Sequence, residues 1–176
     1  MFWKINYFIQ DFYKKHGPFE THLDVGSRDI NGTVLNCLKE TRLDMPKQST
    51  GIDFIDGQNV DVVLNGHDIE SYFGQDSFDL VTCCETLEHD DEFWKTVEGI
   101  RAVTKPGGYA LITVPGPYFF LHDYPGDYYR FTKQAVEKMF EGWEDVHVEE
   151  FQDPEQLKLE DAKANLSILG YGRKPK

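Results

Sequence analysis

The chain has 176 residues, the length of one ordinary domain and too short for two independent cores. Apolar residues make up 40% of the sequence and charged residues 28%, which is typical of globular proteins and not of disordered ones. Acidic residues outnumber basic ones by 31 to 18, and the formal charge is -13. Because such a surface repels phosphate backbones, we expect no nucleic acid among the partners.

Cysteine content and hydropathy indicate the compartment. The three cysteines include the adjacent pair Cys83 and Cys84 in an apolar run, which indicates neither a disulfide framework nor a zinc site. No apolar stretch reaches the roughly 18 residues that span a bilayer, and the first residues lack the pattern of a signal peptide. We therefore expect a cytoplasmic protein that binds no membrane. The sequence favours no particular oligomeric state.

Residues 2–16 predict an amphipathic helix that ends at Gly17-Pro18. Aromatic side chains recur at helical spacing from Trp3 to Phe12, with charged residues on the rest of the helical wheel. Such a helix either packs on its own domain or lies on a membrane surface, and we favour packing on the domain.

Strands and helices alternate through the rest of the chain. The predicted helices begin at a cap, which is Asn31 or Thr33 in the first and Thr132 in the last. The alternation predicts a single α/β domain over residues 1–176 with a mainly parallel sheet, doubly wound and covered on both faces. A final antiparallel pair is expected, because too few residues separate the last two strands for a crossover helix. The predicted strands are residues 22–25, 51–54, 60–64, 78–83, 109–114, 146–151 and 166–171, and the predicted helices are residues 33–40, 91–103 and 132–140.

The loops that follow parallel strands meet at one edge of the sheet, where ligands bind in such folds. The first loop begins Asp24-Val25-Gly26-Ser27, and its glycine lets the backbone approach a ligand closely. An ordinary strand-to-helix turn would explain the same residues. The loop lacks the Gly-x-Gly-x-x-Gly pattern of dinucleotide-binding proteins.

The next strands also end in groups suited to a nucleoside. Asp53 can accept hydrogen bonds from both hydroxyls of a ribose. In the pair Asp68-Ile69, the carboxylate can accept from an amino group while the aliphatic side chain packs on a flat ring. Asp68 is equally suited to cap a short helix. The fourth strand leads into residues 84–89, Cys-Glu-Thr-Leu-Glu-His, and a Lys-Pro-Gly-Gly turn precedes the fifth.

In order and spacing, these motifs resemble the class I, seven-stranded Rossmann-like methyltransferases of the type 11 group over residues 23–114. The resemblance implies a doubly wound, mainly parallel seven-stranded sheet with a final antiparallel strand. It also implies an enzyme that transfers a methyl group from S-adenosylmethionine to a small-molecule acceptor and needs no metal.

The resemblance also implies roles for individual residues. Members of the group have glycines in the first loop where this chain has Arg28 and Ile30. Arg28 is either a partner for the cofactor's carboxylate or a solvated side chain. The candidate cofactor-binding residues are Asp24, Gly26 and Ser27 near the methionine part, Asp53 at the ribose, Phe54, Asp68 and Ile69 at the adenine, and Cys83 through its backbone.

Residues 115–131 are the candidate acceptor loop. The segment is rich in aromatic residues, which suit a sugar ring, and it resembles a segment of family members associated with surface-polysaccharide biosynthesis. His122 is the first candidate for a general base and His89 the second. Alternatively, the aromatic residues cover the edge of the sheet and His122 is solvated. Residues 1–17 are expected to close over the cofactor as a lid.

Three other interpretations compete with a methyltransferase. His-Asp pairs at residues 67–68, 89–90 and 122–123 suggest metal ligands of a phosphohydrolase, but such enzymes resemble helical bundles, and chance recurrence explains the pairs better. A nicotinamide-dependent oxidoreductase shares the fold, but the glycine pattern is missing. The alternative without catalysis is a degenerate domain that binds the cofactor, or nothing, and serves as a partner subunit, and the altered first loop supports it.

Overall fold

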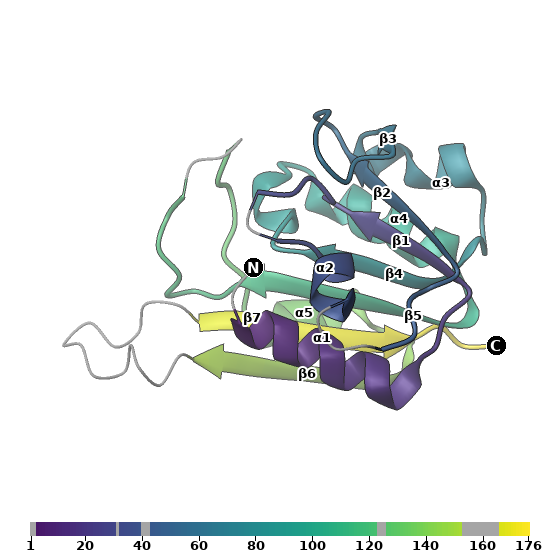
Figure 1. The fold of residues 1–176 in the computed structure, drawn as a ribbon. Helices are drawn as coiled ribbons and strands as arrows, with labels where there is room; N and C mark the ends of the chain where they lie inside the picture. Colours follow the sequence, from purple (N-terminus) through teal and green to yellow (C-terminus); the bar gives the residue numbers. More distant parts are fainter. Residues whose placement is uncertain (1–2, 31, 40–42, 123–125, 153–165) are drawn as a thin grey trace.

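The computed structural model describes residues 3–30, 32–39, 43–122, 126–152 and 166–176. A seven-stranded sheet forms its centre, with helices on both faces (Figure 1). The strands are β1 (Thr21–Val25), β2 (Gln48–Asp53), β3 (Val62–Val63), β4 (Phe78–Cys84), β5 (Thr104–Pro115), β6 (Glu144–Gln152) and β7 (Leu166–Arg173). The helices are α1 (Trp3–His16), α2 (Val34–Lys39), α3 (Ile69–Phe73), α4 (Phe93–Val103) and α5 (Lys133–Met139), with 3-10 turns η1 (Gly66–Asp68) and η2 (Leu87–His89).

The strand order is β3-β2-β1-β4-β5-β7-β6. The five neighbouring strands β3, β2, β1, β4 and β5 pair in parallel, whereas β7 is antiparallel to both β5 and β6. The order reverses between β1 and β4, and in doubly wound sheets a ligand binds at the carboxyl ends of the strands beside such a switch point. The predicted fold class, including the final antiparallel strand, is confirmed.

Two hydrophobic clusters, one on each face, hold the helices to the sheet. The helices α3, α4 and α5 pack on one face around residues such as Ile69, Ile100 and Val136. The helices α1 and α2 pack on the other, where Phe12 and Leu38 meet strand residues. Residues of the central strand β1 from His22 onward are buried, as expected for a strand covered on both faces.

Several predicted boundaries differ from the structure. The strand β2 begins at Gln48 and ends at Asp53, so that Phe54 lies beyond the strand. The Lys-Pro-Gly-Gly turn lies inside β5 and not before it. Both testable caps are confirmed: the Oγ1 of Thr33 accepts from the backbone N–H of Asn36, and that of Thr132 accepts from Ala135, each at 3.2 Å. Asn31 lies outside the described residues.

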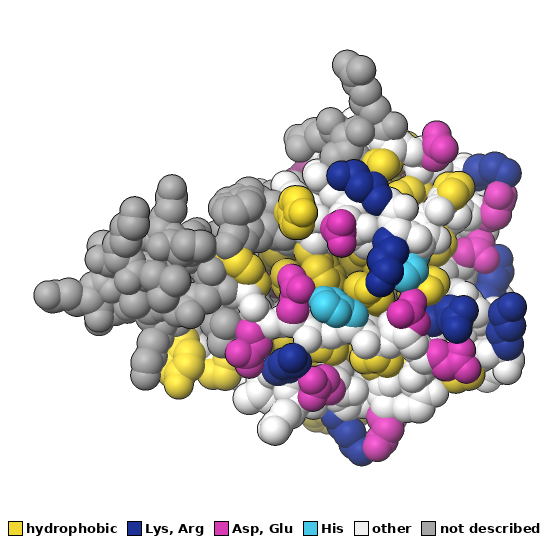
Figure 2. Space-filling view, turned by 90° about the horizontal axis from the view of Figure 1, so that it is seen from below, with side chains coloured by type: hydrophobic (Ala, Val, Ile, Leu, Met, Phe, Trp, Pro, Cys, Tyr) yellow, Lys and Arg dark blue, Asp and Glu magenta, His cyan; other side chains and the backbone are white. Residues whose placement is uncertain are grey.

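The helix α1 lies along the face of the sheet (Figure 1). Its buried stripe includes Ile5, Phe8 and Phe12, and the ring of Phe12 lies 4.9 Å from that of Tyr171 in β7. Within the described residues, no helix is long and apolar enough to cross a bilayer. On the face that Figure 2 shows, acidic and basic side chains are interspersed, so the excess negative charge is not gathered there.

Candidate functional site

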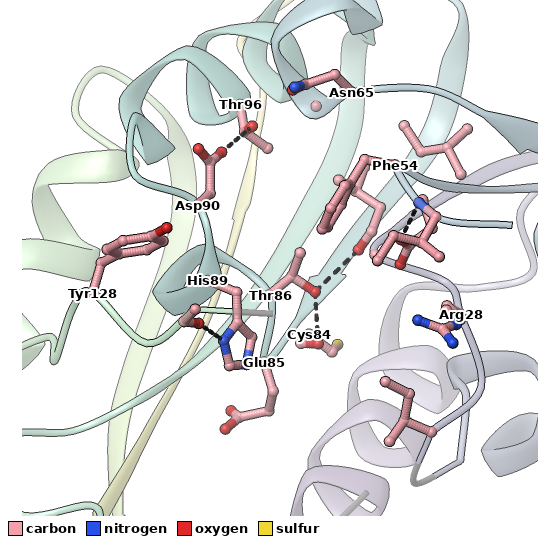
Figure 3. A pocket seen from close by; sticks show the side chains of 18 of the residues that line it. Arg28, Phe54, Asn65, Cys84, Glu85, Thr86, His89, Asp90, Thr96 and Tyr128 are labelled. Carbon is pink, nitrogen blue, oxygen red and sulfur yellow. Dashed lines mark hydrogen bonds between the residues drawn. The ribbon is translucent and has the colours of Figure 1, made fainter. Parts of the chain in front are cut away.

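A cavity of about 860 Å³ opens at the carboxyl ends of β1, β2, β4 and β5. The loops after these strands line it, as the topology predicts. In Figure 3, Phe54 and Arg28 lie on one side of the cavity, while Tyr128 and His89 lie on the other. A volume of this size is in the range of pockets that hold a drug-sized ligand, about 300–1,000 Å³.

The first loop supplies a backbone floor at Gly26. Its φ is +75°, a left-handed conformation that favours glycine, and a Cβ at this position would collide with the side chain of Thr86. The backbone N–H groups of Gly26 and Ser27 both donate to the carbonyl oxygen of Ile52, at 2.9 Å. Gly26 lines the cavity, as predicted, and Arg28 and Ile30 line it too.

Ser27 has a different place from the one predicted. Its side chain is buried, and its Oγ donates to the carbonyl oxygen of Asn59 at 2.8 Å. It does not line the cavity. The side chain points away because the loop turns at Gly26, so Ser27 ties the first loop to the loop after β2.

Asp53 and Phe54 line the cavity, as predicted. The Oδ1 atom of Asp53 accepts from the backbone N–H of Ile55 at 2.9 Å, and this bond holds the carboxylate at the end of β2. The side chain of Phe54 is 53% exposed, which leaves the face of its ring open. A carboxylate beside an open aromatic ring suits a nucleoside, with hydroxyls on one group and a flat base on the other.

The residues after β3 correct the prediction for the adenine pocket. Neither Asp68 nor Ile69 lines the cavity. The turn η1 leads directly into α3, so that Asp68 is the residue before the helix. The side chain of Ile69 is completely buried in the core. The cavity wall is formed instead by the preceding residues Asn65 and His67.

A network of polar groups forms this part of the wall. His67 Nε2 lies 2.8 Å from the Oδ1 of Asp90, and the Oδ2 of Asp90 accepts from the hydroxyl of Thr96 at 2.6 Å. Asn65 accepts from the backbone N–H of His67 at 2.9 Å. Figure 3 shows the bond between Asp90 and Thr96 facing the cavity. The sequence analysis named His67 and Asp90 only within His-Asp pairs and did not predict that they meet, because they come from segments far apart in the chain.

Asp24 and Cys83 lie beneath the cavity and do not line it. Successive side chains of a strand point to opposite faces, so a residue at the end of a strand can be buried while its neighbour faces the ligand. Asp24 is 5% exposed and accepts from Thr82 Oγ1 at 2.7 Å, and its burial raises its pKa to about 7. Cys83 is completely buried, and Cys84 takes its place at the cavity.

The two candidate bases lie together at the other end of the cavity. The rings of His89 and His122 are 4.9 Å apart and almost perpendicular. His89 Nδ1 is within hydrogen-bonding distance of the carbonyl oxygen of Gly126, and burial lowers the pKa of His89. The backbone N–H of His122 donates to Asp127 Oδ2 at 2.6 Å. Both histidines line the cavity, although the sequence did not predict that they would meet.

Two glutamates stand beside these histidines, and no role was predicted for either. Glu85 lines the cavity, and burial raises its pKa to about 7. Glu88 is completely buried, and burial raises its pKa well above the ordinary value. The Oε1 atom of Glu88 lies 3.6 Å from His89 Nε2 and 3.8 Å from His122 Nε2. The spacing Glu-x-x-Glu-His after β4 was a signal for this cluster.

Comparisons with known proteins identify the family of the chain. A family model described as a methyltransferase domain matches residues 3–169. The chain belongs to this family of methyltransferase domains. No curated protein matches it significantly in sequence.

Solved structures of methyltransferases share the fold. An S-adenosylmethionine-dependent methyltransferase from Archaeoglobus fulgidus aligns with a TM-score of 0.73 at 16% identity, over 97% of this chain and 93% of the other. The NodS N-methyltransferase of Bradyrhizobium japonicum, in complex with S-adenosylhomocysteine, has a TM-score of 0.66 at 13% identity, over 98% and 86%. Phosphoethanolamine N-methyltransferase 2 of Haemonchus contortus has 0.69 at 18%, over 99% and 53%. The predicted class I methyltransferase fold is confirmed.

Two predicted segments remain to be located relative to the cavity: the lid helix and the acceptor loop. No residue from Ile5 to His16 lines the cavity, because the aromatic stripe of α1 is buried against the sheet. The expectation of a lid is therefore wrong for this part of the helix. The loop after β5 does reach the cavity through Phe119, Phe120 and Tyr128. Residues 123–125 lie outside the described residues.

Proposed function

We propose that this methyltransferase transfers the methyl group of S-adenosylmethionine to a small-molecule acceptor, with a sugar or polysaccharide precursor as the candidate class. One observation carries the proposal: a single cavity has two different ends. Gly26, Asp53 and Phe54 at one end suit a nucleoside, and His89 and His122 line the other end. An acceptor and a cofactor that share one cavity can be brought into line for transfer.

The residues at the first end fit the cofactor. The carboxylate of Asp53 is positioned for ribose hydroxyls, and the open face of Phe54 for adenine. The glycine floor at Gly26 brings backbone close to the ligand, and Arg28 at the same end offers a cation for a carboxylate. S-adenosylmethionine supplies an electrophilic methyl group when bound.

The second end suits a polar acceptor with a flat or ring-shaped body. Aromatic side chains of Phe119, Phe120 and Tyr128 line it, and such faces pack on rings. Transfer forms a bond between the acceptor's nucleophilic atom and the methyl carbon and breaks the carbon–sulfur bond. A hydroxyl acceptor also loses its proton, and the neighbouring His122 and His89 are the candidate bases. The net charge of -13 supports a partner other than nucleic acid.

Calorimetry with S-adenosylhomocysteine tests the cofactor end. Asp53→Ala removes two charge-assisted hydrogen bonds to the ribose, each worth about 1.5–3 kcal/mol. We expect at least a hundredfold weaker binding, with little change in the thermal unfolding of the ligand-free protein. Asp56→Ala, a few residues further along the same loop and not part of the cavity wall, is the matched control. Equal affinities of Asp53→Ala and the native chain would falsify the assignment.

Activity is tested separately with the methyl-labelled cofactor and a panel of sugars, sugar phosphates and small acids. Transfer of label to a panel member supports the enzyme. Tight binding of the cofactor, with no transfer to a panel member or to any compound in a water-soluble extract, would favour the degenerate binding domain.

A further inference from the structure

Three side chains at the acceptor end present acceptor atoms to one another. One ring nitrogen of each of His89 and His122 and a carboxylate oxygen of Glu88 all lie within 4.8 Å of one another. We propose that these residues form a binding site for a divalent transition-metal cation, which holds an oxygen atom of the acceptor substrate.

The hydrogen bonds around the histidines leave the Nε2 lone pairs available. In His89, Nδ1 faces the carbonyl oxygen of Gly126, which can only accept, so Nδ1 carries the proton. In His122, Nδ1 lies 3.4 Å from the carbonyl oxygen of Phe120, which favours the same tautomer. A neutral histidine with its proton on Nδ1 is a metal ligand through Nε2, and a carbonyl partner on the other nitrogen is typical of such ligands.

The third group of the cluster is the carboxylate of Glu88. Its side chain is completely buried, and among the residues that the structure describes neither Oε1 nor Oε2 has a hydrogen-bond partner. A buried carboxylate without a partner costs several kcal/mol, and an unpaired one is rare in folded proteins. When Glu88 is ionised, two nitrogen lone pairs face the same carboxylate, and none of the three groups then supplies a donor to the others. A cation between them satisfies all three.

The dimensions and the ligand types suit a transition metal. With bonds of about 2.0–2.2 Å, tetrahedral ligands lie roughly 3.4 Å apart, close to the 3.6 Å and 3.8 Å between Glu88 Oε1 and the two Nε2 atoms. Two imidazoles and one carboxylate favour Zn²⁺, Fe²⁺, Co²⁺ or Mn²⁺ over Ca²⁺ and Mg²⁺, which prefer oxygen ligands.

The charge around the cluster also favours a cation. Glu85 lies nearby on the cavity wall, and Asp127 is neutralised by an ion pair with Arg130, whose NH2 lies 2.7 Å from Asp127 Oδ2. Arg130 is therefore already paired, and no described lysine or arginine pairs with either glutamate; the basic groups beside Glu88 are His89 and His122 themselves.

The site opens on the cavity, because His89 and His122 both line it. Three protein ligands leave at least one open coordination position, as in catalytic metal sites. That position faces the acceptor end, where an acceptor hydroxyl or carboxylate oxygen can occupy it. This part of the inference rests on the proposed function: the histidines then hold the cation, and the proton of a coordinated hydroxyl passes to the carboxylate of Glu85 on the same cavity wall.

A metal titration of the whole protein tests the site without any assay of activity. After removal of metals with a chelator, Co²⁺ is added and its visible absorption recorded, followed by displacement with Zn²⁺. We expect one saturable Co²⁺ per chain, and at least tenfold weaker binding in Glu88→Gln and in His122→Ala. Glu149→Gln is the matched control, because Glu149 contacts His147 at 3.0 Å on the exposed strand β6, away from the cavity.

The outcomes separate this site from the proposed function. Absence of saturable Co²⁺, Zn²⁺ or Mn²⁺ binding, or binding that Glu88→Gln leaves unchanged, overturns the metal site. It would mean that a shared proton holds the cluster together. S-adenosylhomocysteine binding is measured on the same samples. If the native chain does not bind it, the proposed function alone is overturned. If Glu88→Gln binds it as the native chain does, this variant is folded. If Glu88→Gln does not fold, His122→Ala, at the cavity surface, decides the question.

Discussion

The two ends of the cavity are built in different ways. At the cofactor end, Gly26 and Asp53 stand directly at the carboxyl ends of neighbouring strands, so the sheet itself fixes their positions. At the acceptor end, His89 follows β4 and His122 lies in the long loop after β5, and buried Glu88 lies between them. The first end depends on backbone geometry and the second on side chains that meet from separate segments.

This difference explains which substitutions each end should tolerate. A backbone floor cannot accept an added Cβ but is insensitive to exchanges of exposed side chains. A cluster of side chains depends on the charge and shape of each member. Three predictions sharpen this comparison, from the largest expected effect to the smallest.

The largest effect is expected in the layer beneath the cofactor end, at Asp24. Burial raises the pKa of Asp24 to about 7, so the folded protein binds a proton that the unfolded chain releases near pH 4. The stability that this proton contributes is fully present below pH 4 and is lost as the pH rises through about 7. Three pKa units correspond to on the order of 4 kcal/mol.

Asp24→Asn should remove this pH dependence, since the amide keeps the shape and does not ionise. Urea unfolding of both proteins between pH 4 and pH 8 measures it: the free energy of unfolding of the native chain should fall relative to the variant as the pH rises. Burial lowers the pKa of the nearby His22 to about 3, which gives a pH dependence of opposite sign. This contribution is present in both proteins and cancels in the difference. Parallel curves across the whole range would contradict the prediction.

An intermediate effect is expected for the backbone floor. Gly26→Ala combines a left-handed φ of +75° with a collision against Thr86 and should destabilise the fold by roughly 2–4 kcal/mol. Gly142→Ala is a matched control, because its φ is +78° but a Cβ there meets nothing within 4 Å. It should cost only about 1 kcal/mol. Thermal unfolding of the two variants measures the difference, and equal costs would show that Thr86 moves aside.

The sequence predicted the cofactor end better than the acceptor end, for a physical reason. Strand ends such as Asp53 are fixed by local pattern and by the rule that parallel strands end at one edge. The same rule cannot show which way a side chain points, and therefore Asp24 and Cys83 were placed in the cavity although they lie beneath it. Ile69 was misplaced because the turn η1 shifts the chain by part of a helical turn.

The acceptor end could be predicted only in outline. The position of the loop after β5 followed from topology, but the meeting of His89 with His122 depends on how that loop folds back. The loop is anchored by backbone bonds to Glu88, whose carbonyl oxygen accepts from Tyr128 N–H at 2.8 Å. Such long-range contacts leave no periodic pattern in a sequence. The helix α1 was identified from its spacing, whereas its position over the sheet was not, since an apolar stripe does not specify what covers it.

The smallest effect compares one aromatic ring at each end. Phe54 and Phe120 are 53% and 52% exposed and both line the cavity, although the ring of Phe120 also lies 4.7 Å from that of Phe119 and 5.9 Å from that of His122. Replacing Phe54 with Leu removes a ring face worth about 0.5–1.5 kcal/mol in stacking, and S-adenosylhomocysteine should bind roughly threefold to tenfold more weakly by calorimetry. Phe120→Leu removes an equal ring at the other end and should leave this affinity unchanged, while the KM of an acceptor rises by a similar factor. Because both variants lose the same surface, a general loss of packing would weaken cofactor binding in both. An equal loss of cofactor affinity in the two variants would therefore contradict the division of the cavity into a cofactor end and an acceptor end.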